Sequence, residues 1–149
     1  MNWNRDKSVM LSRWCVAVFA VCLAALDIGA YRFARWFVAV RQIQWQFGVL
    51  LMISIYAGSV FGWLCLCQLR RLLNNIRHGD VFVADNVRCM RLVSWCCAGA
   101  SLVSLLSSAY YLPFAFVAVA SGFMGLIVRI VKNAFQQAIA MKDELDFTV

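Results

Sequence analysis

Four long apolar runs occupy most of the chain and constrain its fold more than any other feature. They cover about residues 14–31, 47–67, 92–110 and 112–131. Each is close to the roughly 17–25 residues that an α-helix needs to cross about 30 Å of hydrocarbon. A soluble protein of 149 residues could not bury four such runs. We therefore expect an all-α integral membrane protein with four transmembrane helices in an up-down antiparallel bundle.

The composition agrees with this class of protein. Hydrophobic residues make up 64% of the chain and charged residues 14%, whereas soluble domains average roughly 45–50% and 25%. The chain holds one proline and no stretch rich in serine or glycine that could link two domains. We expect a single four-helix membrane domain over residues 1–149, with the lipid bilayer as its main partner.

The distribution of basic residues predicts the orientation of the chain. If the four helices alternate in direction, all but three of the 14 lysines and arginines lie on one side of the membrane. The exceptions are Arg32, Arg35 and Arg41. Because loops rich in Lys and Arg stay in the cytoplasm, we expect both termini to be cytoplasmic. The net charge of +7 is divided among several loops, so direct nucleic-acid binding is not expected.

The outer connections are short. Residues 32–46 mix aromatic rings with arginines, which favour the head-group layer. They predict an outer interfacial loop, or a short interfacial helix as an alternative. Pro113 follows the second outer turn and is suited to the first turn of the fourth helix, where its missing N–H is not needed.

The cytoplasmic side carries the longer segments. Residues 68–91 form the predicted loop, and the second helix is expected to continue into it because leucines keep helical spacing there. Gly79 is suited to end that helix, and Asp85 or Asn86 to cap the next one. The fourth helix is expected to extend likewise into a cytoplasmic tail over residues 133–149.

Small residues recur at helical spacing in two spans. They are Ser54, Gly58 and Gly62 in the second span, and Ala118 and Gly122 in the fourth. Such stripes let helix backbones approach closely in lipid. They fit packing within one chain and homodimerisation alike, so both interpretations remain open.

The seven cysteines include no Cys-x-x-Cys pair, and none falls in a predicted external loop. We interpret them as small, polarizable packing residues. His78 stands alone without the spacing of a metal site. We therefore predict neither a metal nor a cofactor.

Three segments together resemble a known family. They are residues 76–82 (IRHGDVF), 85–92 (DNVRCMRL) and 146–149 (DFTV). Their order and spacing are similar to those of the domain of unknown function 2975 family, whose members are small bacterial four-helix membrane proteins. Family members often have Ser or Thr, then Pro, where this chain has Val83 and Ala84. The resemblance implies a bacterial inner-membrane location and no established biochemical activity.

Some members of that family are encoded beside a small helix-turn-helix regulator. By analogy, the resemblance implies a membrane partner for a cytosolic transcription regulator. We therefore expect a non-enzymatic interaction or regulatory protein that acts through its cytoplasmic loop and tail. The candidate partner-binding residues are Gly79, Phe82, Asp85, Asn86, Arg88, Arg91, Asp146 and Thr148.

Asp27 is the only acidic residue inside a predicted span. Together with Tyr31 and Arg32 it forms a candidate intramembrane polar site. A carboxylate inside a bilayer costs about 2.5–3.5 kcal/mol on insertion scales and marks a functional site unless it is paired. The alternative function is therefore a small transporter or proton-coupled permease that uses Asp27. The sequence contains no recognisable nucleophile–base pair, so an enzyme is not expected.

Overall fold

The computed structural model describes residues 3–77 and 83–147, and nearly all of them are helical. The elements are α1 (Trp3–Arg41), α2 (Trp45–Arg77), α3 (Ala84–Ser107) and α4 (Pro113–Phe147). This described part of the chain contains no strand, so the all-α prediction is confirmed. Each helix contains a stretch long and apolar enough to cross a membrane. The protein has the architecture of a multi-pass membrane protein.

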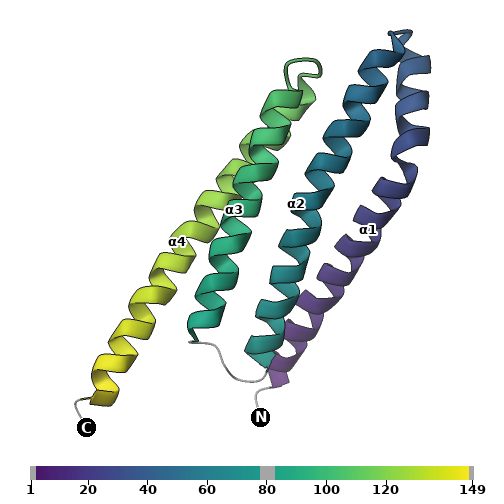
Figure 1. Ribbon diagram of the computed structural model, residues 1–149. Coiled ribbons are helices and arrows are strands. Elements are labelled where there is room, and N and C mark those ends of the chain that lie inside the picture. The colour runs from purple at the N-terminus through teal and green to yellow at the C-terminus, as the bar shows by residue number, and fades with distance from the viewer. Residues whose placement is uncertain (1–2, 78–82, 148–149) are drawn as a thin grey trace.

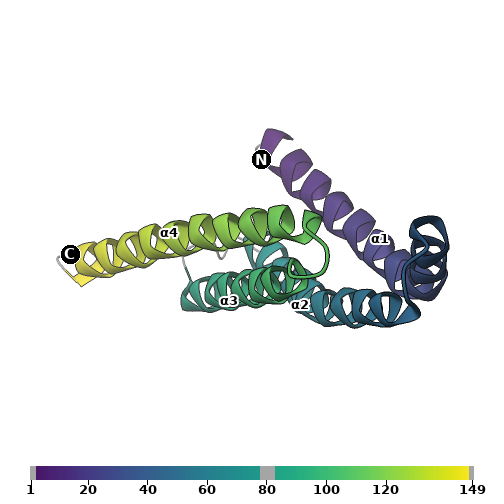
Figure 2. The same ribbon diagram turned by 90° about the horizontal axis from the view of Figure 1, so that it is seen from above.

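The four helices form an open, curved row (Figures 1 and 2). Among the described residues, α2 packs against α1 and α3, and α3 packs against α4, whereas α1 makes no contact with α3 or α4. The start of α1 and the end of α4 belong to opposite ends of this row but lie on the same side of the protein, the lower side in Figure 1, together with the end of α2 and the start of α3. α4 has 35 residues and α3 has 24, so α4 extends roughly 16 Å further at its C-terminal end.

Large apolar side chains cover the outside of the row rather than its interior. Ile28 is 84% exposed, Phe116 77% and Leu112 72%. The buried apolar residues are mostly small, among them Ala30, Ala34 and Ala118. This distribution fits a lipid solvent, in which apolar side chains face outward and small residues let the helices meet.

The small residues of α4 serve packing within the chain. The Ser101 hydroxyl donates to the Ala118 carbonyl at 2.7 Å, and the Ser94 hydroxyl donates to the Gly125 carbonyl at 3.0 Å. A Cβ added at Gly122 would lie 3.1 Å from the Ser101 hydroxyl oxygen. These contacts require close approach of α3 and α4, which larger side chains on α4 would prevent.

The small residues of α2 face two different helices, α1 and α3. Gly62 lies against Leu23 of α1, where an added Cβ would be 3.1 Å from the leucine side chain. Ser54 faces α3, where the Ser107 hydroxyl donates to it at 2.7 Å. Gly58 has no neighbour within 4 Å of the position a Cβ would occupy. Internal packing therefore explains Gly62 and Ser54 but not Gly58.

Two helix boundaries differ from those predicted. Residues 32–41 are not a loop, because α1 continues without interruption to Arg41 and ends where Gln42 adopts a left-handed φ of 51°. Capping of α3 by Asp85 or Asn86 is also wrong. The helix begins at Ala84 after Val83, with no side-chain cap, and both residues lie inside its first turn.

Other boundary predictions are confirmed. Pro113 is the first residue of α4, and α2 and α4 remain helical well past the apolar runs, to Arg77 and Phe147. The third helix ends at Ser107, slightly before the predicted residue 110. Gly79, the predicted end of the second helix, lies outside the described residues.

Substitution of Gly99 tests the close approach of α2 and α3. A Cβ at this position would collide with the Phe61 ring. Gly99→Ala should therefore lower the free energy of unfolding in detergent by about 1–3 kcal/mol. Gly58→Ala is the matched control, because the same methyl group meets open space there. Equal unfolding free energies for the two variants would contradict the packing described.

Candidate functional site

A group of polar side chains joins the end of α2 to the start of α3. The Arg71 guanidinium donates to both carboxylate oxygens of Asp85, at 3.1 Å from Nε and 2.9 Å from Nη2. Asn75 Nδ2 donates to Asp85 Oδ2 at 2.9 Å and to Asn86 Oδ1 at 2.9 Å. We call these four residues, Arg71, Asn75, Asp85 and Asn86, the polar clasp.

The clasp combines an exposed ion pair with a buried amide. The side chains of Arg71 and Asp85 are 62% and 31% exposed, and an ion pair in such a position contributes about 1 kcal/mol or less. Asn86 is 0% exposed. A buried amide that lost its partner would cost about 1–3 kcal/mol. Asn86 is therefore the member on which the joint between α2 and α3 depends most.

These positions divide the candidate partner-binding residues into groups. Asn86 is inside the protein and cannot offer its side chain to a partner, and Asp85 is engaged by α2. Arg88 and Arg91 are exposed on α3, in the two helical turns that follow the clasp. Gly79, Phe82 and Thr148 lie outside the described residues, as does the side chain of Asp146.

Asp27 contacts α2 rather than the neighbours predicted for it. Trp63 Nε1 donates to Asp27 Oδ2 at 3.0 Å, and the Tyr56 hydroxyl donates to the Asp27 carbonyl at 3.3 Å. The other carboxylate oxygen, Oδ1, is buried and has no hydrogen-bond partner among the described residues. The site is thus a half-satisfied carboxylate between α1 and α2.

Tyr31 and Arg32 do not join this group. Both are exposed. The Tyr31 ring lies edge-on to Trp45, with ring centroids 6.3 Å apart, and below the Arg35 guanidinium at 5.8 Å. Tyr31 therefore belongs to the aromatic and basic end of α1. Trp63 was missed because its partner, Asp27, lies on another helix and far away in the sequence.

A second polar group, also missed by the sequence analysis, joins α2 to the far end of α3. The hydroxyls of Ser54 and Tyr110 are 2.6 Å apart, and Ser107 donates to Ser54 at 2.7 Å. The Tyr110 hydroxyl also lies 3.2 Å from the Leu50 carbonyl. Sequence spacing revealed only the small size of Ser54, not the hydroxyls opposite it.

The interpretation of the cysteines as packing residues fits four of the seven, which lie where α2 and α3 meet. It is wrong for Cys15, Cys22 and Cys67, which are exposed. Cys89 and Cys96 are buried, and Cys65 of α2 lies beside Cys97 of α3. Within residues 3–77 and 83–147, no three His, Cys, Asp or Glu side chains are grouped as metal ligands.

Comparison with known proteins gives one result. The family described as Protein of unknown function (DUF2975) matches residues 12–149, nearly the whole chain. No curated protein and no solved structure matches.

Substitution of Asn86 tests the polar clasp. Asn86→Ala should lower the unfolding free energy by about 2 kcal/mol, because Asn75 loses an acceptor in a buried position. Asn133→Ala removes the same amide from an exposed position on α4 and should change stability by less than about 0.5 kcal/mol. Denaturant titration of the two purified variants measures the difference. A neutral Asn86→Ala would show that the clasp does not hold the helices.

Proposed function

Since the chain belongs to the DUF2975 family, we propose that it is a non-enzymatic interaction protein of the bacterial inner membrane. Both termini face the cytosol, and the chain crosses the bilayer in alternating directions. The partner is a cytosolic protein, of which a helix-turn-helix regulator is the specific candidate. The cytosolic extensions of α2 and α4 form the docking face, together with the start of α3.

The orientation is supported by charge. Arg70, Arg71 and Arg77 lie near the end of α2, and Arg88 and Arg91 near the start of α3. These arginines lie on the same side of the protein as the start of α1 and the end of α4, the lower side in Figure 1. Cationic segments of this kind remain on the cytoplasmic side during insertion.

The polar clasp is the observation that carries the proposal. It fixes the start of α3 against α2 through Arg71, Asn75 and Asn86, while Arg88 and Arg91 remain exposed beside it. A docking face built on a rigid base loses less conformational entropy when it binds. α4, which extends beyond α3 (Figure 1), adds a helical surface at the same end.

Capture experiments test the docking face. The solubilised protein should retain a cytosolic helix-turn-helix regulator from the same organism, and Arg88→Glu/Arg91→Glu should weaken this capture at least tenfold, since charge reversal at a rim alters complementarity. Arg32→Glu/Arg35→Glu is the matched control at the opposite end of the protein and should bind normally. Failure of the wild-type protein to capture the regulator, or equal loss in both variants, would count against the proposal.

A transporter that uses Asp27 is a second candidate, favoured by the unpartnered oxygen of that carboxylate. Oδ1 is buried and free to accept a proton or contact a cation, as expected of functional acids in membranes. Proton flux into proteoliposomes should then vanish in Asp27→Asn. Trp63→Phe, which removes only the hydrogen bond to Oδ2, should retain flux. Equal flux for wild type and Asp27→Asn would exclude this function.

A further inference from the structure

A groove runs between α1 and α2, in the half of the protein that contains the chain ends. Its volume is about 230 Å³. One wall consists of Arg13, Val16, Ala17 and Ala20 of α1, at the spacing of one helix face. The small side chains of Ala17 and Ala20 leave room on that wall.

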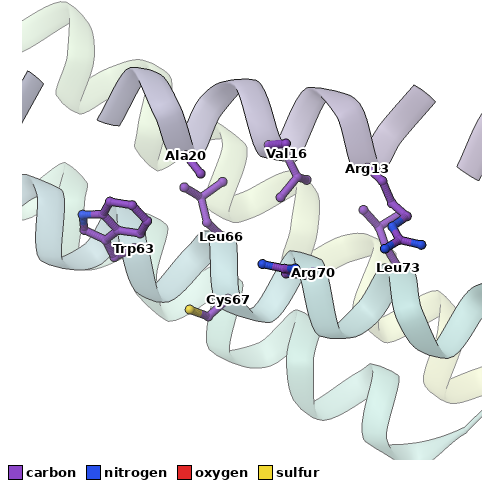
Figure 3. Close-up of a pocket in the computed structure, with 9 residues that line it drawn as sticks. Arg13, Val16, Ala20, Trp63, Leu66, Cys67, Arg70 and Leu73 are labelled. Carbon is purple, nitrogen blue, oxygen red and sulfur yellow. The ribbon is translucent and has the colours of Figure 1, made fainter. Parts of the chain in front are cut away.

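The opposite wall comes from α2 and is larger. Figure 3 shows Arg13 and Leu73 at one end of the groove and Trp63 at the other, with Leu66 and Arg70 between them. From residue 63 to residue 73 the wall is about 15 Å long. This equals roughly one leaflet, half of the approximately 30 Å hydrocarbon thickness.

The charge of the groove is unbalanced. Its described lining residues include Arg13 and Arg70 but no acidic residue. Two guanidinium groups in one groove repel each other unless an anion lies between them. The remaining walls are apolar and belong to the membrane-spanning parts of α1 and α2. An occupant therefore needs an anionic end and a long apolar part.

We propose that this groove binds an anionic phospholipid, with its phosphate held by Arg13 and Arg70 and one acyl chain lying along Val16, Ala20 and Leu66 toward Trp63. Basic pockets between transmembrane helices bind lipid head groups of this kind. Because α1 contacts only α2 among the described helices, the bound chain adds contact area to the least supported helix of the row. The site does not depend on the cytosolic partner proposed above.

Native mass spectrometry of the full chain in detergent tests this site. The probes are phosphatidylglycerol, phosphatidylcholine with the same acyl chains, and inorganic phosphate. The wild-type protein should bind phosphatidylglycerol in preference to phosphatidylcholine and should not retain phosphate. Arg13→Gln/Arg70→Gln should weaken phosphatidylglycerol binding about 30-fold, at about fivefold for each cation lost.

Two control variants distinguish lipid binding in the groove from a general effect of positive charge and from nonspecific contact of lipid with the helix surface. Arg32→Gln/Arg35→Gln removes two arginines from the other end of α1 and should leave binding unchanged. Ala20→Phe fills the groove without altering charge and should abolish phosphatidylglycerol binding, whereas Val18→Phe, at an exposed position of the same helix, should not. The proposal is overturned if wild type binds both lipids equally, if it retains inorganic phosphate as well as lipid, or if the arginine and Ala20 variants bind like wild type.

Discussion

The hydrocarbon core of a bilayer offers no hydrogen-bond partner to the polypeptide backbone, and the rest of this structure follows from that constraint. Each spanning segment must satisfy its own N–H and C=O groups, which an α-helix does. Once the helices have formed, lipid does not drive them together as water would. Their association depends on close backbone approach and on hydroxyl and amide groups that find partners across helices. The chain supplies both, at Gly99 against Phe61 and at Ser101 and Ser94 against α4 carbonyls.

The two polar groups between α2 and α3 lie at opposite ends of their contact. Ser54, Ser107 and Tyr110 join one end, and the polar clasp joins the other. Two such attachments fix the register of α2 against α3. These two helices form the middle of the row. α1 is held by Trp63 and Tyr56 at Asp27 and by aromatic contacts at its far end, where Phe37 lies edge-on to Tyr111 at 5.2 Å. The groove lined by Arg13 and Arg70 lies between α1 and α2 as well.

The sequence was sufficient to predict the class of fold because a lipid-spanning helix is a local property. The apolar runs, the position of Pro113 and the helical continuation of α2 and α4 all follow from residues near each other in the chain. The outer interfacial loop was wrong because aromatic and basic residues favour the head-group layer in a helix as well as in a loop, and α1 continues to Arg41. Capping by Asp85 was wrong because its carboxylate is used by Arg71, a tertiary contact that local spacing cannot reveal.

The sequence also could not reveal which tertiary contacts the candidate site residues make. Arg88 and Arg91 became candidates through the family resemblance and are exposed, but the burial of Asn86 and the pairing of Asp27 with Trp63 depend on which helices become neighbours. The groove with Arg13 and Arg70 unites residues that are far apart in the sequence. From the sequence, Arg13 and Arg70 served only to predict which side of the membrane is cytoplasmic. Because both line one apolar groove, we propose that they also bind the head group of an anionic lipid.

Labelling of single added cysteines in intact cells tests the central claim, four membrane crossings with both ends in the cytosol. Gln44→Cys lies in the turn after α1, Ala109→Cys in the turn after α3, and Asn133→Cys on α4 beyond the apolar run. With this topology all native cysteines lie within the membrane or on its cytosolic side, so the wild-type protein is the blank. An impermeant maleimide should label positions 44 and 109 in intact cells, and position 133 only after permeabilisation. Labelling of position 133 in intact cells, or protection of position 44, would contradict the account.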